Sequence, residues 1–119
     1  MAEQRESMGR IEIAPEVLLT IARQAILEVE GVRRMAAVPP EPGKLFRRVM
    51  RQDGIVLHFE DNRLTFDIYV LMEPGVNIVE RSRAAQAAVR EAMDKMVGIP
   101  VQAVNIHVED VVYGQGQTV

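Results

Sequence analysis

The chain has 119 residues, no cysteine and a formal net charge of −3. That length fits a single domain, and the lack of cysteine excludes disulfides, thiolate metal sites and a cysteine nucleophile. The negative charge excludes a global positive field that would draw the protein to nucleic acid or anionic lipid, although a local basic patch is present.

Both ends of the chain are polar, and we expect disordered tails at residues 1–8 and 114–119 on either side of one domain at 9–113. The N-terminal tail has no apolar stretch of the kind found in a signal peptide. No apolar run approaches the ~20 residues of a membrane span. We therefore expect a cytoplasmic protein with no direct membrane span.

A strand and a helix are predicted first. Arg10–Ile13 alternates polar and apolar residues, as a short strand does. Pro15 suits the first position of a helix, where its missing N–H is not needed, and Gly31 is a good left-handed terminator. Apolar residues between them recur at helical spacing, which predicts an amphipathic helix over Pro15–Glu30. Ile21 lies at the centre of its apolar stripe.

The middle of the chain is less regular. A short strand is predicted over 32–38, ending at a proline cluster that no helix or strand interior tolerates. Residues 39–53 are expected to form a variable basic loop, in which Lys44–Gln52 makes one or two turns of basic amphipathic helix. Gly54–Glu60 and Leu64–Met72 then alternate with period two and predict a hairpin.

A second helix and a last strand follow. Asn77 is a plausible N-cap for a helix that continues to Met96 and is ended by Gly98. Pro100–Val112 alternates again and predicts the last strand. The order is β-α-(β)-β-β-α-β, an α/β (α+β) two-layer sandwich. Its two helices pack on one face of a mostly antiparallel sheet and leave the other face partly open.

Several of these segments resemble the alkaline shock protein family, also called the envelope stress response family. The segment at 9–17, Gly-Arg-Ile-Glu-Ile-Ala-Pro-Glu-Val, resembles its opening motif. Gly75-Val76-Asn77-Ile78 resembles its strand-to-helix junction, and Val104–Glu109 resembles its closing strand. The resemblance covers roughly residues 9–112 in the right order. The chain departs from the family pattern in its loop at 39–52 and at Pro74, where the family has tyrosine.

The resemblance implies a bacterial, cytoplasmic protein of the envelope and alkaline stress response, with no enzymatic activity and no cofactor. Some family members self-assemble, and some sit at the membrane through an integral-membrane partner, which implies that this chain acts by self-assembly and protein–protein interaction. The implied partners are therefore further copies of the chain, as a homo-oligomer, and an integral-membrane protein.

Five side chains form a candidate interaction surface on the open sheet face. Alternation predicts that this face carries His58, Asp67, Tyr69, His107 and Glu109. Its mixture of apolar and charged groups suits recognition of another protein, while the simpler interpretation is a solvated face. Imidazole with carboxylate can also bind zinc or another transition metal, so a metal- or small-molecule-binding regulatory domain is the alternative function.

Enzymatic chemistry has little material in this sequence. No Gly-x-Ser-x-Gly elbow and no phosphate-binding glycine loop is present, so we expect no catalytic activity. A candidate anionic-surface patch consists of Lys44, Arg47, Arg48 and Arg51, although a loop kept soluble by these cations is the simpler interpretation. An RNA-binding accessory role is the weakest alternative, because the open face offers one tyrosine and several carboxylates that would repel phosphate.

Overall fold

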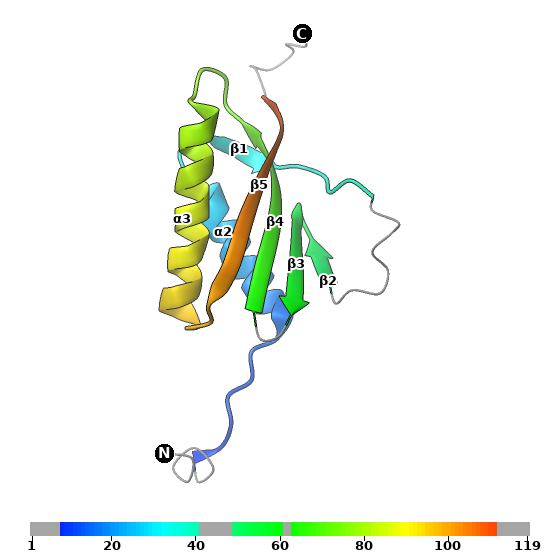
Figure 1. Cartoon of the computed structure of the whole chain (residues 1–119), viewed down its shortest axis with the longest axis vertical. Helices are drawn as coiled ribbons and strands as arrows, with labels where there is room; N and C mark the ends of the chain where they lie inside the picture. The colour runs from blue at the N-terminus through cyan, green and yellow to red at the C-terminus, as the bar shows by residue number, and fades with distance from the viewer. Residues whose placement is uncertain (1–7, 41–48, 61–62, 112–119) are drawn as a thin grey trace.

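The computed structural model describes residues 8–40, 49–60 and 63–111. The elements are helix α2 (Pro15–Leu27), strands β1 (Val32–Met35), β2 (Val49–Gln52), β3 (Ile55–Glu60) and β4 (Arg63–Met72), helix α3 (Ile78–Met96) and strand β5 (Val101–Val111). The strands form one five-stranded sheet, and both helices lie on the same side of it (Figure 1). The predicted α+β sandwich is confirmed.

Strand β4 lies at the centre of the sheet. On one side it pairs antiparallel with β3 along its first part and with β1 at Val70–Met72. On the other side it pairs in parallel with β5. A parallel neighbour needs a crossover connection, which α3 provides. Among the described residues, β2 pairs only with β3, and β5 and β1 each pair only with β4, so these three strands form the edges of the sheet.

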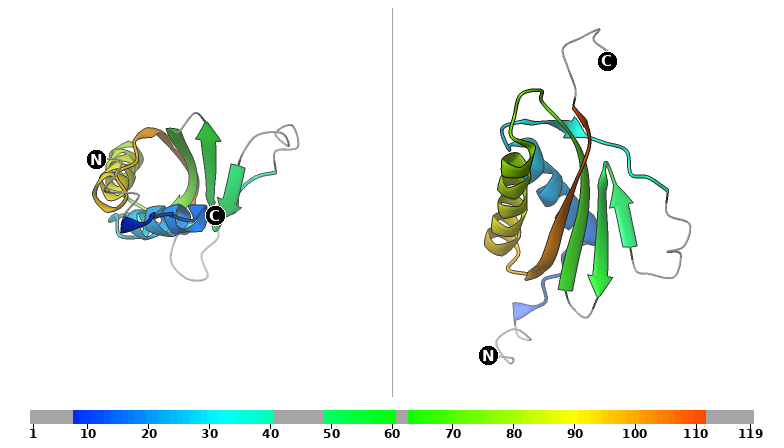
Figure 2. Two further views of the ribbon diagram at one scale, coloured as in Figure 1. Left: turned by 90° about the horizontal axis from the view of Figure 1, so that it is seen from below. Right: turned by 45° about the horizontal axis from the view of Figure 1, so that its top comes forward.

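The core lies between the sheet and the helices, as the view along the layers shows (Figure 2). Alternation correctly placed Leu57, Phe66 and Ile68 on the helix side, where each is fully buried. The helices contribute a matching set of buried residues: Leu18, Leu19, Ile21, Ala22, Ile26, Ala85, Val89 and Met93. Asn77 caps α3, because its Oδ1 accepts a hydrogen bond from the backbone N–H of Glu80 at 3.0 Å. None of the described helices is long and apolar enough to cross a membrane.

Helix α3 is tied to the outer edge of β5 by side chains. Gln86 Nε2 donates to the carbonyl of Val104 at 3.0 Å. The guanidinium of Arg90 donates to the carbonyls of Val101 at 2.9 Å and Gln102 at 3.2 Å. Three carbonyls at the start of this edge strand therefore already accept hydrogen bonds from α3.

The first predicted strand, at Arg10–Ile13, was wrong. These residues are extended but pair with no described strand. Alternation of polar and apolar residues gives a segment two faces, but it does not provide a neighbouring strand for its backbone to hydrogen-bond with. Ile11 is 91% exposed as a result. Helix α2 does begin at Pro15 but ends at Leu27, three residues before the predicted end. Strand β1 likewise stops at Met35, short of residue 38.

The prediction of helical turns at 44–52 was also wrong for residues 49–52, the part of this segment that the structure describes. Residues 49–52 are strand β2, and the next two residues, Asp53 (φ 47°) and Gly54 (φ 81°), turn the chain directly into β3. Two consecutive positive φ angles are typical of the Asp-Gly hairpin turn. Gly54 is further restricted because a Cβ there would lie 2.6 Å from the carbonyl oxygen of Ala36. Most of the predicted loop, and the predicted tails apart from Met8, lie outside the described residues.

Replacing Ile21 with alanine should lower the free energy of unfolding by about 2–5 kcal/mol, because it removes a buried side chain and leaves a cavity. Ile21 is 8% exposed in the core between α2 and the sheet. Urea denaturation followed by circular dichroism measures the change. Val79→Ala on the exposed side of α3 is the control, with an expected change within about 0.5 kcal/mol. Equal effects at the two positions would mean that the apolar stripe of α2 is misassigned.

Candidate functional site on the open sheet face

The sheet face opposite the helices, called the open face below, collects polar side chains from three adjacent strands. In the strand register, Val56 of β3 lies opposite Asp67 of β4, which in turn lies opposite Asn105 of β5. One step along β4 and β5, Tyr69 lies opposite His107. Alternation predicted a polar side for each strand separately, and the register shows that these polar sides lie on the same face of the sheet.

Asp67 is the centre of a hydrogen-bonded group that we call the Asp67 cluster: His58, Asp67, Asn105 and His107. His58 Nε2 lies 2.7 Å from Asp67 Oδ2, and His107 Nε2 lies 2.9 Å from Asp67 Oδ1. Asn105 Nδ2 donates to the same Oδ1 at 3.1 Å. An ionised carboxylate only accepts hydrogen bonds, so both imidazoles donate from Nε2 to Asp67.

The environment of Asp67 favours its charged form. Burial, the largest single influence, raises the pKa of its carboxyl. Hydrogen bonds from His107, His58 and Asn105 and the coulombic effect of His58 lower the pKa, and together they hold it below the ordinary value of 3.8. Asp67 is therefore a carboxylate whose two oxygens both accept hydrogen bonds, and it links β3, β4 and β5.

Tyr69 is packed against this cluster and presents little surface. Its ring stacks on the imidazole of His107, with centroids 4.3 Å apart and planes 12° apart. The sequence predicted Tyr69 at the exposed centre of the interaction surface. Tyr69 is only 7% exposed, so it does not occupy that position. The side chain of His107 is 38% exposed and is the accessible part of this stack.

Glu109 is separated from the other candidate residues by a bulge. The register runs from Val70 opposite Val108 to Leu71 opposite Asp110, so Glu109 has no partner on β4. One extra residue in a strand interrupts the alternation of side chains. Glu109 is exposed and makes no hydrogen bond or ion pair within the described part of the chain. Uninterrupted alternation would pair Glu109 with Leu71, but Asp110 pairs with Leu71 instead.

The predicted basic patch can be placed in part. Arg51 is an exposed residue of β2 and lies opposite Val56, which puts it on the open face in register with Asp67 and Asn105. Lys44, Arg47 and Arg48 lie outside the described residues. Sequence reasoning left Asn105 out of the candidate site, although its alternation with His107 was a usable signal. Arg51 was missed as a member of this face because β2 was taken for a helix.

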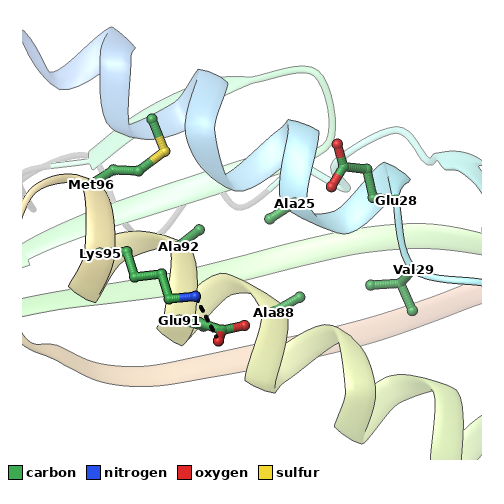
Figure 3. Close-up of a pocket in the computed structure, with 8 residues that line it drawn as sticks. All are labelled: Ala25, Glu28, Val29, Ala88, Glu91, Ala92, Lys95 and Met96. Atoms are coloured by element: carbon green, nitrogen blue, oxygen red, sulfur yellow. Dashed lines mark ion pairs between the residues drawn. The ribbon is translucent and has the colours of Figure 1, made fainter.

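The described residues hold no metal-binding group, and a groove lies between the two helices. Across residues 8–40, 49–60 and 63–111, no group of three or more His, Cys, Asp or Glu side chains is placed to hold a metal ion. A groove between α2 and α3 is lined by Ala25, Glu28, Val29, Ala88, Glu91, Ala92, Lys95 and Met96 (Figure 3). Glu91 and Lys95 form an ion pair at 3.2 Å at this groove, and its other side chains are mostly small and apolar. The groove therefore offers no constellation for chemistry.

Replacing Asp67 with asparagine should lower the free energy of unfolding by about 1–3 kcal/mol at pH 7, because hydrogen bonds to a charged acceptor are lost. The pKa of Asp67 is lower in the folded chain than in the unfolded chain, so its stabilisation is present above pH 3.8 and is lost as the pH falls through the folded-state pKa. Urea titrations of both proteins at a series of pH values should therefore show a difference that shrinks in acid. Glu109→Gln is the control, with no expected change at pH 7. A difference that stays constant into acid would contradict the ionised role of Asp67.

Comparison with other proteins defines the family. Residues 3–113 match the alkaline shock protein 23 family, whose function is cell envelope-related. The uncharacterized protein Spy1535 of Streptococcus pyogenes is 36% identical over 108 residues, which cover 90% of this chain and 82% of that protein. The uncharacterized protein YqhY of Bacillus subtilis is 29% identical over 109 residues, covering 91% of this chain and 81% of YqhY.

Solved structures show a weaker likeness. One MamM-CTD variant has a TM-score of 0.49 and 15% identity, covering 82% of this chain and 98% of that chain. A second MamM-CTD variant has a TM-score of 0.48 and 14% identity, covering 85% of this chain and 100% of the other. The match over residues 3–113, together with the relative at 36% identity, shows that this chain belongs to the alkaline shock protein 23 family, a family of cell envelope-related function.

Proposed function

We propose that this protein is a non-catalytic stress-response component that acts by self-assembly and by binding a protein partner at the cytoplasmic side of the cell envelope. The cell envelope-related function of its family supports the location. The partner in this proposal is an integral-membrane protein. The observation that carries the proposal is the closed hydrogen bonding of the Asp67 cluster on the open face.

That closed hydrogen bonding argues against catalysis. Both oxygens of Asp67 accept hydrogen bonds, Oδ2 from His58 and Oδ1 from His107 and Asn105, so this carboxylate is engaged within the cluster. The Nε2 atoms of both histidines point at the same carboxylate. Among the described residues, neither histidine is hydrogen-bonded to a serine or threonine hydroxyl that it could activate. The cluster acts as a structural link between strands.

The same hydrogen bonding makes the open face suitable for a protein partner. Covering a polar group that has no partner costs free energy, whereas a group that is already hydrogen-bonded can be buried at little cost. The Tyr69–His107 stack adds a flat aromatic element held rigidly in place, and aromatic side chains are enriched at the centres of protein interfaces. Asn105 is exposed beside the stack on β5, and Arg51 is exposed on β2 at the far side of the same face; the two residues provide a polar rim.

A charge reversal at Glu109 tests this surface. Glu109 lies on the strand that carries His107, is exposed and makes no hydrogen bond or ion pair within the described residues, so Glu109→Lys should leave the fold intact. A reversed charge at the rim of an interface should weaken capture of the membrane partner about tenfold, equivalent to ~1.4 kcal/mol. The measurement is quantitative pull-down from membrane and cytoplasmic fractions, after circular dichroism confirms an unchanged fold.

The matched control is Asp94→Lys, the same change of sign at an exposed position of α3 on the helix side of the molecule. It should capture the same partner as the parent. Equal capture by all three proteins would remove the open face from the proposal. A stoichiometric metal ion in the purified protein that is lost in His58→Ala would contradict the proposal and favour a metal-binding regulatory domain.

A further inference from the structure

The segment at residues 9–14, called the N-terminal arm below, has the side-chain arrangement of a strand without a strand partner. Arg10 and Glu12 form an ion pair at 3.6 Å, so these residues, two apart, lie on the same side of the extended chain. Ile11 and Ile13 occupy the alternate positions, and both are exposed. The arm leaves the base of the fold below α2 and leads away from the sheet (Figure 1).

The edges formed by β5 and β2 are not equally available to such a strand. On β5, the carbonyls of Val101, Gln102 and Val104 accept hydrogen bonds from α3, so the helix occupies the first part of that strand. No described strand pairs with the outer edge of β2, which is four residues long. Four residues is also the length of the alternating part of the arm, Arg10–Ile13.

The side chains of the arm and of β2 are complementary when the two are paired. Arg51 lies on the open face, while Met50 points to the helix side and packs against the core. A strand added to β2 with Glu12 opposite Arg51 has opposite charges side by side on the open face. The same register places Ile11 and Ile13 on the helix side, where they extend the apolar surface beyond Met50.

We infer that the N-terminal arm of one copy adds as a strand to the outer edge of β2 in a second copy of this chain. This inference rests on the proposed self-assembly and names its contact. In the described structure the arm pairs with no strand of its own chain, so a second chain supplies the edge. Backbone hydrogen bonds give the contact its strength, and the alternate side chains give it its register. A reciprocal exchange of arms between two copies closes a dimer.

Sedimentation velocity of the full chain over a range of concentrations, combined with hydrogen exchange at residues 10–13, tests the inference. The parent should associate and its arm amides should be protected. Ile11→Asp should weaken association about tenfold or more, because a buried apolar side chain becomes charged, and should abolish the protection. Val79→Asp makes the same kind of change at another exposed position, on α3, and should behave as the parent does.

A charge swap identifies the register independently of apolar burial. Glu12→Arg and Arg51→Glu alone each place like charges side by side and should weaken association by up to about fivefold. The double variant restores opposite charges and should recover most of the loss. Both residues are exposed, so the variants should fold as the parent does.

The possible failures can be told apart. An assembled parent whose Ile11→Asp variant assembles equally well overturns the arm contact and leaves the proposed self-assembly standing. A parent that is monomeric at every concentration overturns both the arm contact and the self-assembly. If the parent is a monomer and its arm amides are protected, the arm pairs with the sheet of its own chain. That result would contradict the inference that the arm binds a second copy.

Discussion

Both edges of β4 are paired to other strands, and the arrangement of the molecule depends on this double pairing. On one side β3 and β1 share its length, and on the other β5 runs parallel to it. A strand enclosed in this way has one face directed entirely at the helices, where Phe66, Ile68 and Val70 are fully buried. Its other face can bring side chains from three strands together. The core and the open face are therefore two consequences of a single register.

The strand register brings hydrogen-bond donors from β3 and β5 to the carboxylate of Asp67. Two histidines and an asparagine, contributed by the strands on either side of β4, all direct donors at its carboxylate. Burial alone would favour the neutral acid, and the donors reverse that preference. The charge is thus compatible with a half-buried position only while β3 and β5 keep their places. The cluster links the open face to the pairing of the sheet.

Much of the fold could be predicted because its longest elements have clear periods. The alternation through β3 and β4 and the Asn77 cap of α3 gave the correct faces and the correct helix start. Strand β2 was missed because its two apolar residues, Val49 and Met50, are consecutive and do not alternate with polar ones. The Asp53-Gly54 pair before β3 was the available signal, since it is a frequent turn between two strands. The strand predicted in the N-terminal arm is the opposite error, since a strand was predicted where the described structure has none. A strand-like pattern does not show whether a neighbouring strand exists.

The candidate site shows a sharper limit of sequence reasoning. Alternation placed His58, Asp67 and His107 on one side of their own strands, but their meeting depends on how far each strand slides against the next. The bulge that removes Glu109 from the row of pairs is likewise a property of two strands together. Tyr69 stacks on His107, which lies 38 positions away in the sequence, and alternation within one strand does not predict such a contact.

The contacts between α3 and β5 have a consequence for solubility. An uncovered edge strand is a template on which other chains can add, and long uncovered edges lead to unlimited sheet growth. Gln86 and Arg90 occupy three carbonyls of β5 without adding a strand. Because these contacts cover the first part of β5, another chain cannot add along the whole length of that strand. This protein can therefore reach high local concentration with less danger of forming the continuous cross-β stacks of amyloid.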